Sequence, residues 1–474
     1  MKRRDFLKSA GALAAGLSLL GDGGRADGAR KAGRPNIIYI MADDLGYGHL
    51  GCYGQKEIKT PNIDRIAAEG IRLTDHYAGS AVCAPSRSVL LEGLHTGHCY
   101  VRGNRPLPVE GNVPLPAASQ TFGKVMQSAG YKTACIGKWG LGYPGSTGDP
   151  NKQGFDHWFG YNCQRQAHSY YPTHLWRNDK KVMLRNGGGA KKDYSHDLMT
   201  LEALKFIRDN AKKPFLLYLP YTIPHSPFQV PELGIYADKA GWSGRKKAIA
   251  AMITRMDRDV GTIAKLIKDL GLDDNTLVIF TSDNGSAGGG LNKLFKGSGP
   301  LRGMKGSLYE GGIRAPFVAR WPGKIAKGSV SAHRSAFWDM LPTFAELGGA
   351  KVTKETDGIS MVPTLLGKKQ KAHEYLYWEF GGAKAVRMGK WKAYVGKGKG
   401  KMALYDLDKD IGETTNLSAD NPELVKQIEA IMAKSHRDTP WSTWKYTGPI
   451  PEGGGQKKPK RRKKNKNRKK PAEK

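Results

Sequence analysis

Nearly uninterrupted apolar runs recur along the first two thirds of the chain, and stretches with helical periodicity separate them. Four of these runs occupy residues 36–41, 133–137, 215–219 and 277–280. A short run of this kind is typical of a strand that is buried on both faces, as in a parallel sheet. We therefore predict four buried strands at these positions.

Apolar residues between these runs recur every three or four positions, which is the pattern of a helix with one buried face. The clearest example spans about residues 247–270, and two shorter ones span 122–129 and 196–210. Strands that alternate with helices predict an α/β fold, with a mostly parallel sheet sandwiched by helices.

The pattern changes near residues 351–371. Beyond this point come four short strand-like runs with Gly-rich loops, at residues 375–378, 385–388, 391–394 and 403–406. A helical pattern over residues 422–433 follows them. Short strands joined by short loops predict antiparallel pairing. We therefore expect an α/β domain over residues 34–350 and a smaller subdomain, an antiparallel sheet plus a helix, over residues 351–450. The chain has no internal repeats.

Composition supports a folded protein. The 474 residues are 39% hydrophobic and include 10 Trp, 20 Tyr and 13 Phe, which is far from the composition of a disordered chain. The five cysteines have no regular spacing, so they indicate neither a disulfide framework nor a zinc site.

The first residues have the organisation of an export signal. Arg3 and Arg4 precede Phe6-Leu7-Lys8 and a short apolar stretch over residues 9–20. This pattern resembles the twin-arginine signals that direct folded proteins out of the cytoplasm. We predict a cleavable signal over residues 1–29 and a periplasmic or extracellular protein. No other stretch reaches the ~18 apolar residues that a membrane span needs, so we expect no transmembrane anchor.

The formal net charge is +33, and part of it is concentrated at the C-terminus. Residues 457–474 contain twelve Lys or Arg and a single acidic residue, Glu473. Such a block repels itself, so we predict a disordered basic tail over residues 451–474. The tail has no interleaved aromatic residues for base stacking, and we expect no specific nucleic-acid binding. Positive charge would also raise the rate of encounter with an anionic polysaccharide.

Polar side chains follow two of the predicted strands at the point where each strand ends. Asp43 and Asp44 follow the first run, and Asp283 and Asn284 follow the fourth. Four carboxylate or amide oxygens suit Ca²⁺ or Mg²⁺. A single Asp pair is weak evidence because turns are rich in Asp, but two pairs at equivalent strand ends predict a metal site.

Two further charged residues follow the remaining predicted strands: Lys138 follows the second run, and His225 follows the third. Ligands of parallel α/β sheets bind beyond the carboxyl ends of the strands. We therefore expect all these polar groups to form a single site.

Cys83 opens a predicted helix beside this site. Pro85 favours a helix start, and the apolar run 89–91 continues the helix. The helix dipole would then make the environment of Cys83 positive, with Arg87 one turn further on the same face. A thiol is a poor ligand for an oxygen-preferring cation. Either Cys83 is a buried structural residue and the metal site is not built, or Cys83 does not remain a thiol.

The sequence resembles the formylglycine-dependent sulfatases of the alkaline-phosphatase superfamily, in which the signature cysteine is oxidised to an aldehyde. The likeness covers most of the chain apart from its basic tail. It rests on ordered motifs: Cys83-Ala84-Pro85-Ser86-Arg87, Leu91-Glu92-Gly93-Leu94-His95-Thr96-Gly97, Gly137-Lys138-Trp139, Ile223-Pro224-His225, Ser282-Asp283-Asn284-Gly285, Gly303-Met304-Lys305-Gly306 and Tyr309-Glu310-Gly311-Gly312.

The resemblance implies an alkaline-phosphatase-like fold, hydrolysis of sulfate esters, and a formylglycine made from Cys83 by a formylglycine-generating enzyme. It also implies a calcium ion, or Mg²⁺, held by Asp43, Asp44, Asp283, Asn284 and the hydrated aldehyde at position 83. The hydrate would resolve the mismatch between thiol and cation, since it binds metal through oxygen. Arg87 would orient it, Lys138 and Lys305 would neutralise the sulfate, and His225 would protonate the leaving alcohol.

One position departs from the family pattern. Relatives often carry His two positions after the lysine of the Gly-Lys-Trp motif, where this chain has Gly140. That histidine is thought to help expel sulfate, so another base is needed. His168 and His174 lie in an aromatic stretch that could also wall the substrate pocket. We predict that one of them substitutes, with His168 favoured.

Two other functions fit the same residues. A phosphate mono- or diester hydrolase of the same superfamily would use the same cations and metal. An inactive protein that binds an anionic glycan would keep Cys83 as a thiol. The preferred interpretation is a sulfatase that acts on a sulfated glycan or a small sulfate ester.

Overall fold

A computed structural model describes residues 34–288, 290–398 and 400–449. The predicted export signal (1–29) and basic tail (451–474) lie outside the described residues, so both stay predictions.

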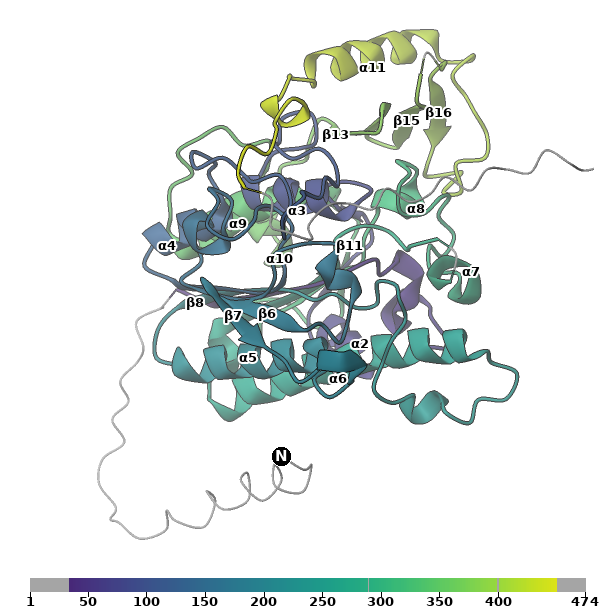
Figure 1. Ribbon diagram of the computed structural model, residues 1–474. Coiled ribbons are helices and arrows are strands. Elements are labelled where there is room, and N and C mark those ends of the chain that lie inside the picture. The colour runs from purple at the N-terminus through teal and green to yellow at the C-terminus, as the bar shows by residue number, and fades with distance from the viewer. Residues whose placement is uncertain (1–33, 289, 399, 450–474) are drawn as a thin grey trace, which may run out of the picture. The chain divides into compact units, whose positions relative to one another are not determined.

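A large mixed sheet forms the centre of the described chain (Figure 1). Its ten described strands have the order β11-β2-β10-β9-β1-β8-β4-β5-β6-β7. In chain order they are β1 (Asn36–Ala42), β2 (Ile71–Leu73), β4 (Lys132–Lys138), β5 (His157–Tyr161), β6 (His174–Arg177), β7 (Lys180–Met183), β8 (Phe215–Pro220), β9 (Thr276–Ser282), β10 (Phe317–Arg320) and β11 (Ser329–Ser331). Two short strands, β3 (His76–Tyr77) and β12 (Ser335–Ala336), pair separately.

The four predicted strands are confirmed as β1, β4, β8 and β9, which are consecutive and parallel in the middle of the sheet. The outer strands were not predicted from the sequence. They include three antiparallel pairings: β10 with β9, β5 with β6, and β6 with β7. These strands of three to five residues carry too little periodicity to be recognised without their neighbours.

Alternating residues of the central strands face two separate hydrophobic layers. Ile37, Tyr39 and Met41 of β1 pack into one layer. Ile38 and Ile40 pack into the other. Both sets are fully buried, which explains why the strand is apolar on both faces.

Helices cover both faces of the sheet, as predicted (Figure 1). One layer contains α3 (Cys83–Glu92), α4 (Phe122–Ser128), α8 (Glu310–Ile313), α9 (Met340–Gly348) and α10 (Val362–Leu365). The opposite layer contains α2 (Pro61–Ala68), α5 (Ser195–Asp209), α6 (Gly244–Asp269) and α7 (Leu291–Phe295). The pattern over 247–270 therefore corresponds to α6, whose apolar face lies in the core.

The C-terminal part forms a second, antiparallel sheet. Its described strands are β13 (Leu376–Phe380), β14 (Ala383–Met388), β15 (Trp391–Val395) and β16 (Ala403–Asp406), paired in chain order. Helix α11 (Pro422–Lys434) packs on this sheet through Ile428, Ile431 and Met432. The predicted antiparallel sheet and helix are thus confirmed; the domain boundary at 350 stays a prediction.

A fully buried ionic cluster connects the small sheet to the large one. Lys392 of β15 donates to Glu310 of α8 over 2.7 Å and lies 3.4 Å from Glu413. The backbone N–H of Glu310 donates to Glu413 over 2.8 Å. Removal of one partner from such a cluster would leave an uncompensated buried charge and is therefore expected to destabilise the contact between β15 and α8.

No helix among the described residues is long and apolar enough to cross a membrane. All five cysteines lie in the described part of the chain, and each is a free thiol there, in agreement with the absence of a disulfide pattern.

Buried neutral histidines predict that acid weakens the fold. Burial lowers the pKa of His49 to about 4 and that of His76 to about 3, from an ordinary value near 6.5. The unfolded chain therefore binds more protons between pH 6.5 and 4, and the free energy of unfolding decreases as the pH falls through that range. Each histidine contributes at most about 1.4 kcal/mol per pH unit.

Denaturant titrations at several pH values measure this slope. His49 accepts from the Gly46 N–H and donates to the Leu291 carbonyl, so protonation breaks its first hydrogen bond. We expect His49→Gln to flatten the slope between pH 6.5 and 4, whatever its effect on absolute stability. An unchanged slope would contradict this origin of the pH dependence.

Candidate active site

The polar residues predicted to form a site lie together at the carboxyl ends of the central parallel strands. Asp43 and Asp44 follow β1 directly, and Asp283 and Asn284 follow β9. Lys138 is the last residue of β4, and His225 lies in the loop after β8. Parallel neighbours end at the same edge of a sheet, which explains why residues distant in sequence meet here.

Helix α3 places Cys83 at this edge. The helix begins at Cys83, and the N–H of its second residue, Ala84, donates to the Asn104 side chain over 3.0 Å. The Cys83 side chain is only 1% exposed. Its Sγ donates to Asp43 over 3.3 Å and accepts from the Lys305 ammonium at 3.5 Å.

Arg87 lies one turn further along α3 and is fully buried. Its guanidinium donates to Asp283 over 2.7 Å and to the carbonyl of Lys138 over 2.7 Å. The side chain thereby ties α3 to the ends of β9 and β4, and its fixed charge offsets the buried carboxylate.

Three carboxylates and the Cys83 sulfur lie close enough to surround one cation. One ligand atom from each of Asp43, Asp44, Cys83 and Asp283 lies within 4.8 Å of the others. Asn284 adds a buried amide oxygen that has no hydrogen-bond partner in the described structure. A hard divalent cation would satisfy that oxygen and neutralise the clustered carboxylates, so the donor set fits Ca²⁺ or Mg²⁺.

The backbone is strained where two of these ligands meet. Asp44 has φ +69°, in the left-handed region that non-glycine residues rarely occupy. Its N–H donates to Asp283 over 3.1 Å, and Asn284 donates to its carboxylate over 2.9 Å. These bonds hold a conformation that aims the Asp44 side chain into the cluster.

Three cationic or ionisable side chains surround the carboxylates. Lys138 lies 2.6 Å from Asp43, and Lys305 lies 2.6 Å from Asp44. His225 Nε2 lies 3.4 Å from Asp44. Lys138 is fully buried, so its charge acts with little screening by water.

The charges of the site shift its pKa values in a consistent direction. Burial by itself raises the pKa of Asp43, but Lys138, His225 and Arg87 together hold that pKa well below its usual range. Burial, Asp283 and Asp43 raise the pKa of the Cys83 thiol far above neutrality. An unmodified Cys83 therefore stays protonated and is a weak nucleophile.

The structure separates the two histidines that could replace the family's missing one. The ring of His168 stacks on that of His225, with centroids 4.3 Å apart. Burial, His225 and Lys138 lower the pKa of His168 to about 4, so it is a neutral base at neutral pH. His174 instead lies 2.9 Å from Glu110 and makes no contact with the cluster among the described residues.

Two further side chains near the site carry no motif that the sequence could reveal. Asn104 caps α3, as described above, and Gln164 packs against Gly140. Single Asn and Gln residues in loops are too common to be informative. The one signal in the sequence is the glycine at position 140, which indicates that another side chain, here that of Gln164, could occupy the space.

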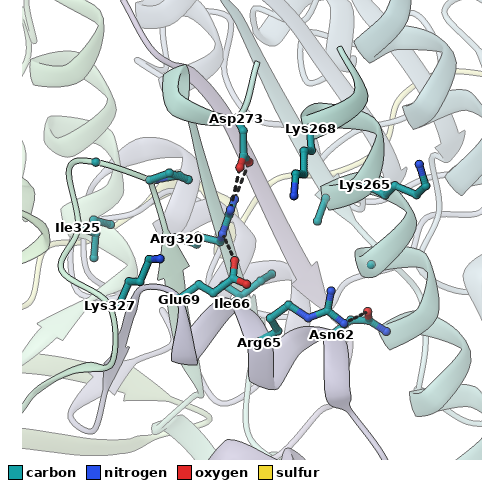
Figure 2. A pocket seen from close by; sticks show the side chains of 14 residues that line it. Asn62, Arg65, Ile66, Glu69, Lys265, Lys268, Asp273, Arg320, Ile325 and Lys327 are labelled. Carbon is teal, nitrogen blue, oxygen red and sulfur yellow. Dashed lines mark hydrogen bonds and ion pairs between the residues drawn. The ribbon is translucent and has the colours of Figure 1, made fainter. Parts of the chain in front are cut away.

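A separate pocket of about 620 Å³ lies at the opposite end of the central strands, near the start of β9 (Figure 2). Among the residues that line it, Arg320 forms ion pairs with Glu69 and Asp273, and Asp273 precedes the start of β9. None of the predicted catalytic or metal-binding residues lines this pocket. The chemically equipped site is the one at the carboxyl ends of the strands.

Comparisons with known proteins agree with this geometry. The sequence model of the sulfatase family matches residues 35–350, and that of the N-sulphoglucosamine sulphohydrolase C-terminal region matches residues 304–438. Human arylsulfatase A is 34% identical over 488 aligned positions, which cover 89% of this chain and 90% of the relative. Rat N-acetylgalactosamine-6-sulfatase is 33% identical, over 76% of this chain and 71% of the relative.

Among solved structures, Ps i-CgsB in complex with k-i-k-neocarrahexaose superimposes with a TM-score of 0.74 and 32% identity, covering 85% of this chain and 92% of that one. The match over 35–350 spans well over half of the sequence, and it includes the cysteine, the acidic pairs and both lysines of the site. The chain therefore belongs to the sulfatase family, the hydrolases of sulfate esters.

Proposed function

We propose that this sulfatase hydrolyses sulfate esters of a sulfated glycan, using a formylglycine formed from Cys83 and a bound divalent cation. One observation carries the proposal. Cys83 is buried at the positive end of α3, 3.3 Å from Asp43 and 3.5 Å from Lys305, inside a cluster of hard oxygen ligands. A thiol suits neither that cation nor nucleophilic attack at its raised pKa, whereas the hydrate of an aldehyde suits both.

The remaining residues have complementary roles in this proposal. Lys138 and Lys305 bind the sulfate oxygens, and their fixed charges neutralise the negative charge that redistributes as the S–O bond breaks. His225 donates a proton to the departing alcohol from Nε2. Arg87 contacts Asp283 and the Lys138 carbonyl, so it acts by holding a metal ligand and the end of β4 in place.

Asp43, Asp44, Asp283 and Asn284 would hold the cation, with Ca²⁺ preferred and Mg²⁺ as the alternative. When bound, the cation supplies Lewis acidity and lowers the cost of placing negative charge beside the carboxylates.

The proposed substrate class is supported by the solved relative in complex with k-i-k-neocarrahexaose, and by relatives named for action on N-acetylgalactosamine. The high positive charge of this chain favours encounter with such polyanions. We also propose that the protein is exported after folding, with Cys83 oxidised beforehand by a formylglycine-generating enzyme in the cytoplasm.

Mass spectrometry of the peptide that contains position 83, from protein produced in its native host, tests this function. We expect the mass of an aldehyde, together with faster turnover of sulfate esters than of phosphate esters. A preference for phosphate esters would favour the phosphohydrolase alternative. An intact thiol with tight glycan binding and no turnover would favour an inactive binding protein.

His168 is expected to supply the base that the family pattern places at position 140. It is neutral and stacked against His225, so His168→Ala should lower kcat by more than about tenfold. His174→Ala is the matched control, because His174 pairs with Glu110 away from the cluster. Steady-state kinetics of both variants decide the assignment, which is wrong if His168→Ala turns over within tenfold of the parent.

A further inference from the structure

The side chain of Gln164 occupies the space beside Gly140, the position that departs from the family pattern. The φ of Gly140 is +85°, where L-residues are strained. A Cβ at this position would lie 2.8 Å from Cγ and 2.9 Å from Nε2 of Gln164. The amide of Gln164 therefore fills the space into which a side chain at position 140 would project.

The surrounding backbone places Gln164 between two parts of the active site. Beyond β4, Trp139 and Gly140 donate to the carbonyls of Tyr161 and Asn162, so the chain after Lys138 runs beside the segment that leads to Gln164. A short 3₁₀ turn, Gln166–His168, then carries the chain to His168, which stacks on His225. Gln164 thus lies on the link between Lys138 and the two stacked histidines.

Gln164 is largely buried, yet the donor on its side chain is unused. The residue is only 6% exposed, and its backbone N–H donates to the Asn112 side-chain oxygen over 3.3 Å. Its Nε2 has no hydrogen-bond partner among the described residues. Buried amide donors are nearly always paired in folded proteins, so this unpaired donor beside Gly140, two residues after Lys138, is available to a partner that comes with the substrate.

We propose that Gln164 is a substrate-binding residue whose Nε2–H donates to an oxygen of the bound sulfate ester. The proposal rests on the sulfatase function proposed above. A carboxamide can donate this hydrogen bond but cannot accept a proton near neutral pH. In the space beside Gly140, Gln164 therefore acts only as a hydrogen-bond donor and leaves the proton transfer to His168.

Gln164→Met tests the proposal, because it removes the donor while retaining the length of the side chain. We expect kcat/KM for a sulfate ester to decrease about 10-fold to 100-fold, mainly through KM, because one hydrogen bond to a charged group is lost. Gln164→Glu should decrease it further, since its carboxylate repels the sulfate. Gln153→Ala is the control: Gln153 is fully buried, but its amide nitrogen donates to the carbonyls of Pro116 and Thr147.

A double-mutant cycle adds a readout that a purely structural role would not produce. Gly140→Ala should displace the Gln164 amide and so lower kcat/KM by the same route as Gln164→Met. The decrease in the double variant should therefore be smaller than the two single decreases combined. A Gln164→Met enzyme with kcat/KM within twofold of the parent, or fully additive losses, would overturn the proposal. Failure of the parent to hydrolyse sulfate esters would instead refute the function on which the proposal rests.

Discussion

Replacement of Cys83 by alanine is expected to reduce sulfate ester hydrolysis by at least about 10⁴-fold. The variant keeps Arg87, both lysines and the acidic cluster, so it should still bind the substrate. It lacks any group at position 83 that could be oxidised to an aldehyde or attack sulfur. Turnover of a chromogenic aryl sulfate and equilibrium binding of a sulfated oligosaccharide measure the two effects separately.

Cys52→Ala is the matched control. Cys52, like Cys83, is in no disulfide, but it lies in a short helical turn after β1 and is not part of the acidic cluster. We expect its turnover to stay close to that of the parent. Full activity of Cys83→Ala, or of a preparation in which residue 83 is an intact thiol, would refute the proposed chemistry.

Removal of the divalent cation is expected to have the second largest effect. Burial and the neighbouring Asp43 raise the pKa of Asp283, since a second negative charge beside Asp43 is unfavourable in a buried cluster. A cation relieves this repulsion, so chelation should lower both the melting temperature and the turnover, the latter by at least about a hundredfold. Dialysis against a chelator, followed by addition of Ca²⁺ or Mg²⁺, measures the loss and its recovery.

Asp283→Asn should raise the cation concentration that restores half of the activity. The control is Asp357→Asn, because His95, His98 and Asp357 form the other described group that could hold a metal ion. His95 Nδ1 accepts from the Gly97 N–H, so the neutral ring carries its proton on Nε2, the atom that faces Asp357. This arrangement favours a hydrogen-bonded cluster over a metal site, and Asp357→Asn should leave the cation dependence unchanged. Undiminished activity after exhaustive chelation would contradict the metal assignment.

The agreement between sequence and structure is closest where burial is complete. The strands β1, β4, β8 and β9 are buried on both faces, so their sequences are apolar throughout and recognisable in isolation. The apolar stripe of α6 and the short strands of the C-terminal sheet were likewise apparent from their periodicity. The short outer strands, β2, β10 and β11, depend on pairing with neighbours and were not predicted.

The same contrast applies to the site. Asp43, Asp44, Lys138 and Asp283 could be predicted to converge because parallel strands end at one edge of a sheet. Their motifs also resemble those of the sulfatase family, to which the chain belongs. The metal, the modification of Cys83 and the role of each residue stay predictions.

The sequence by itself determined the fold class, the edge of the sheet at which the candidate site lies, and the family, because strand burial and motif order are local properties of the chain. Only the tertiary structure decided which of His168 and His174 lies at the site, and that Gln164 fills the space beside Gly140. Those outcomes depend on the path of the loops after β4 and β5 and on contacts across them. Such contacts arise when separate segments pack together, and no periodicity in the sequence encodes them.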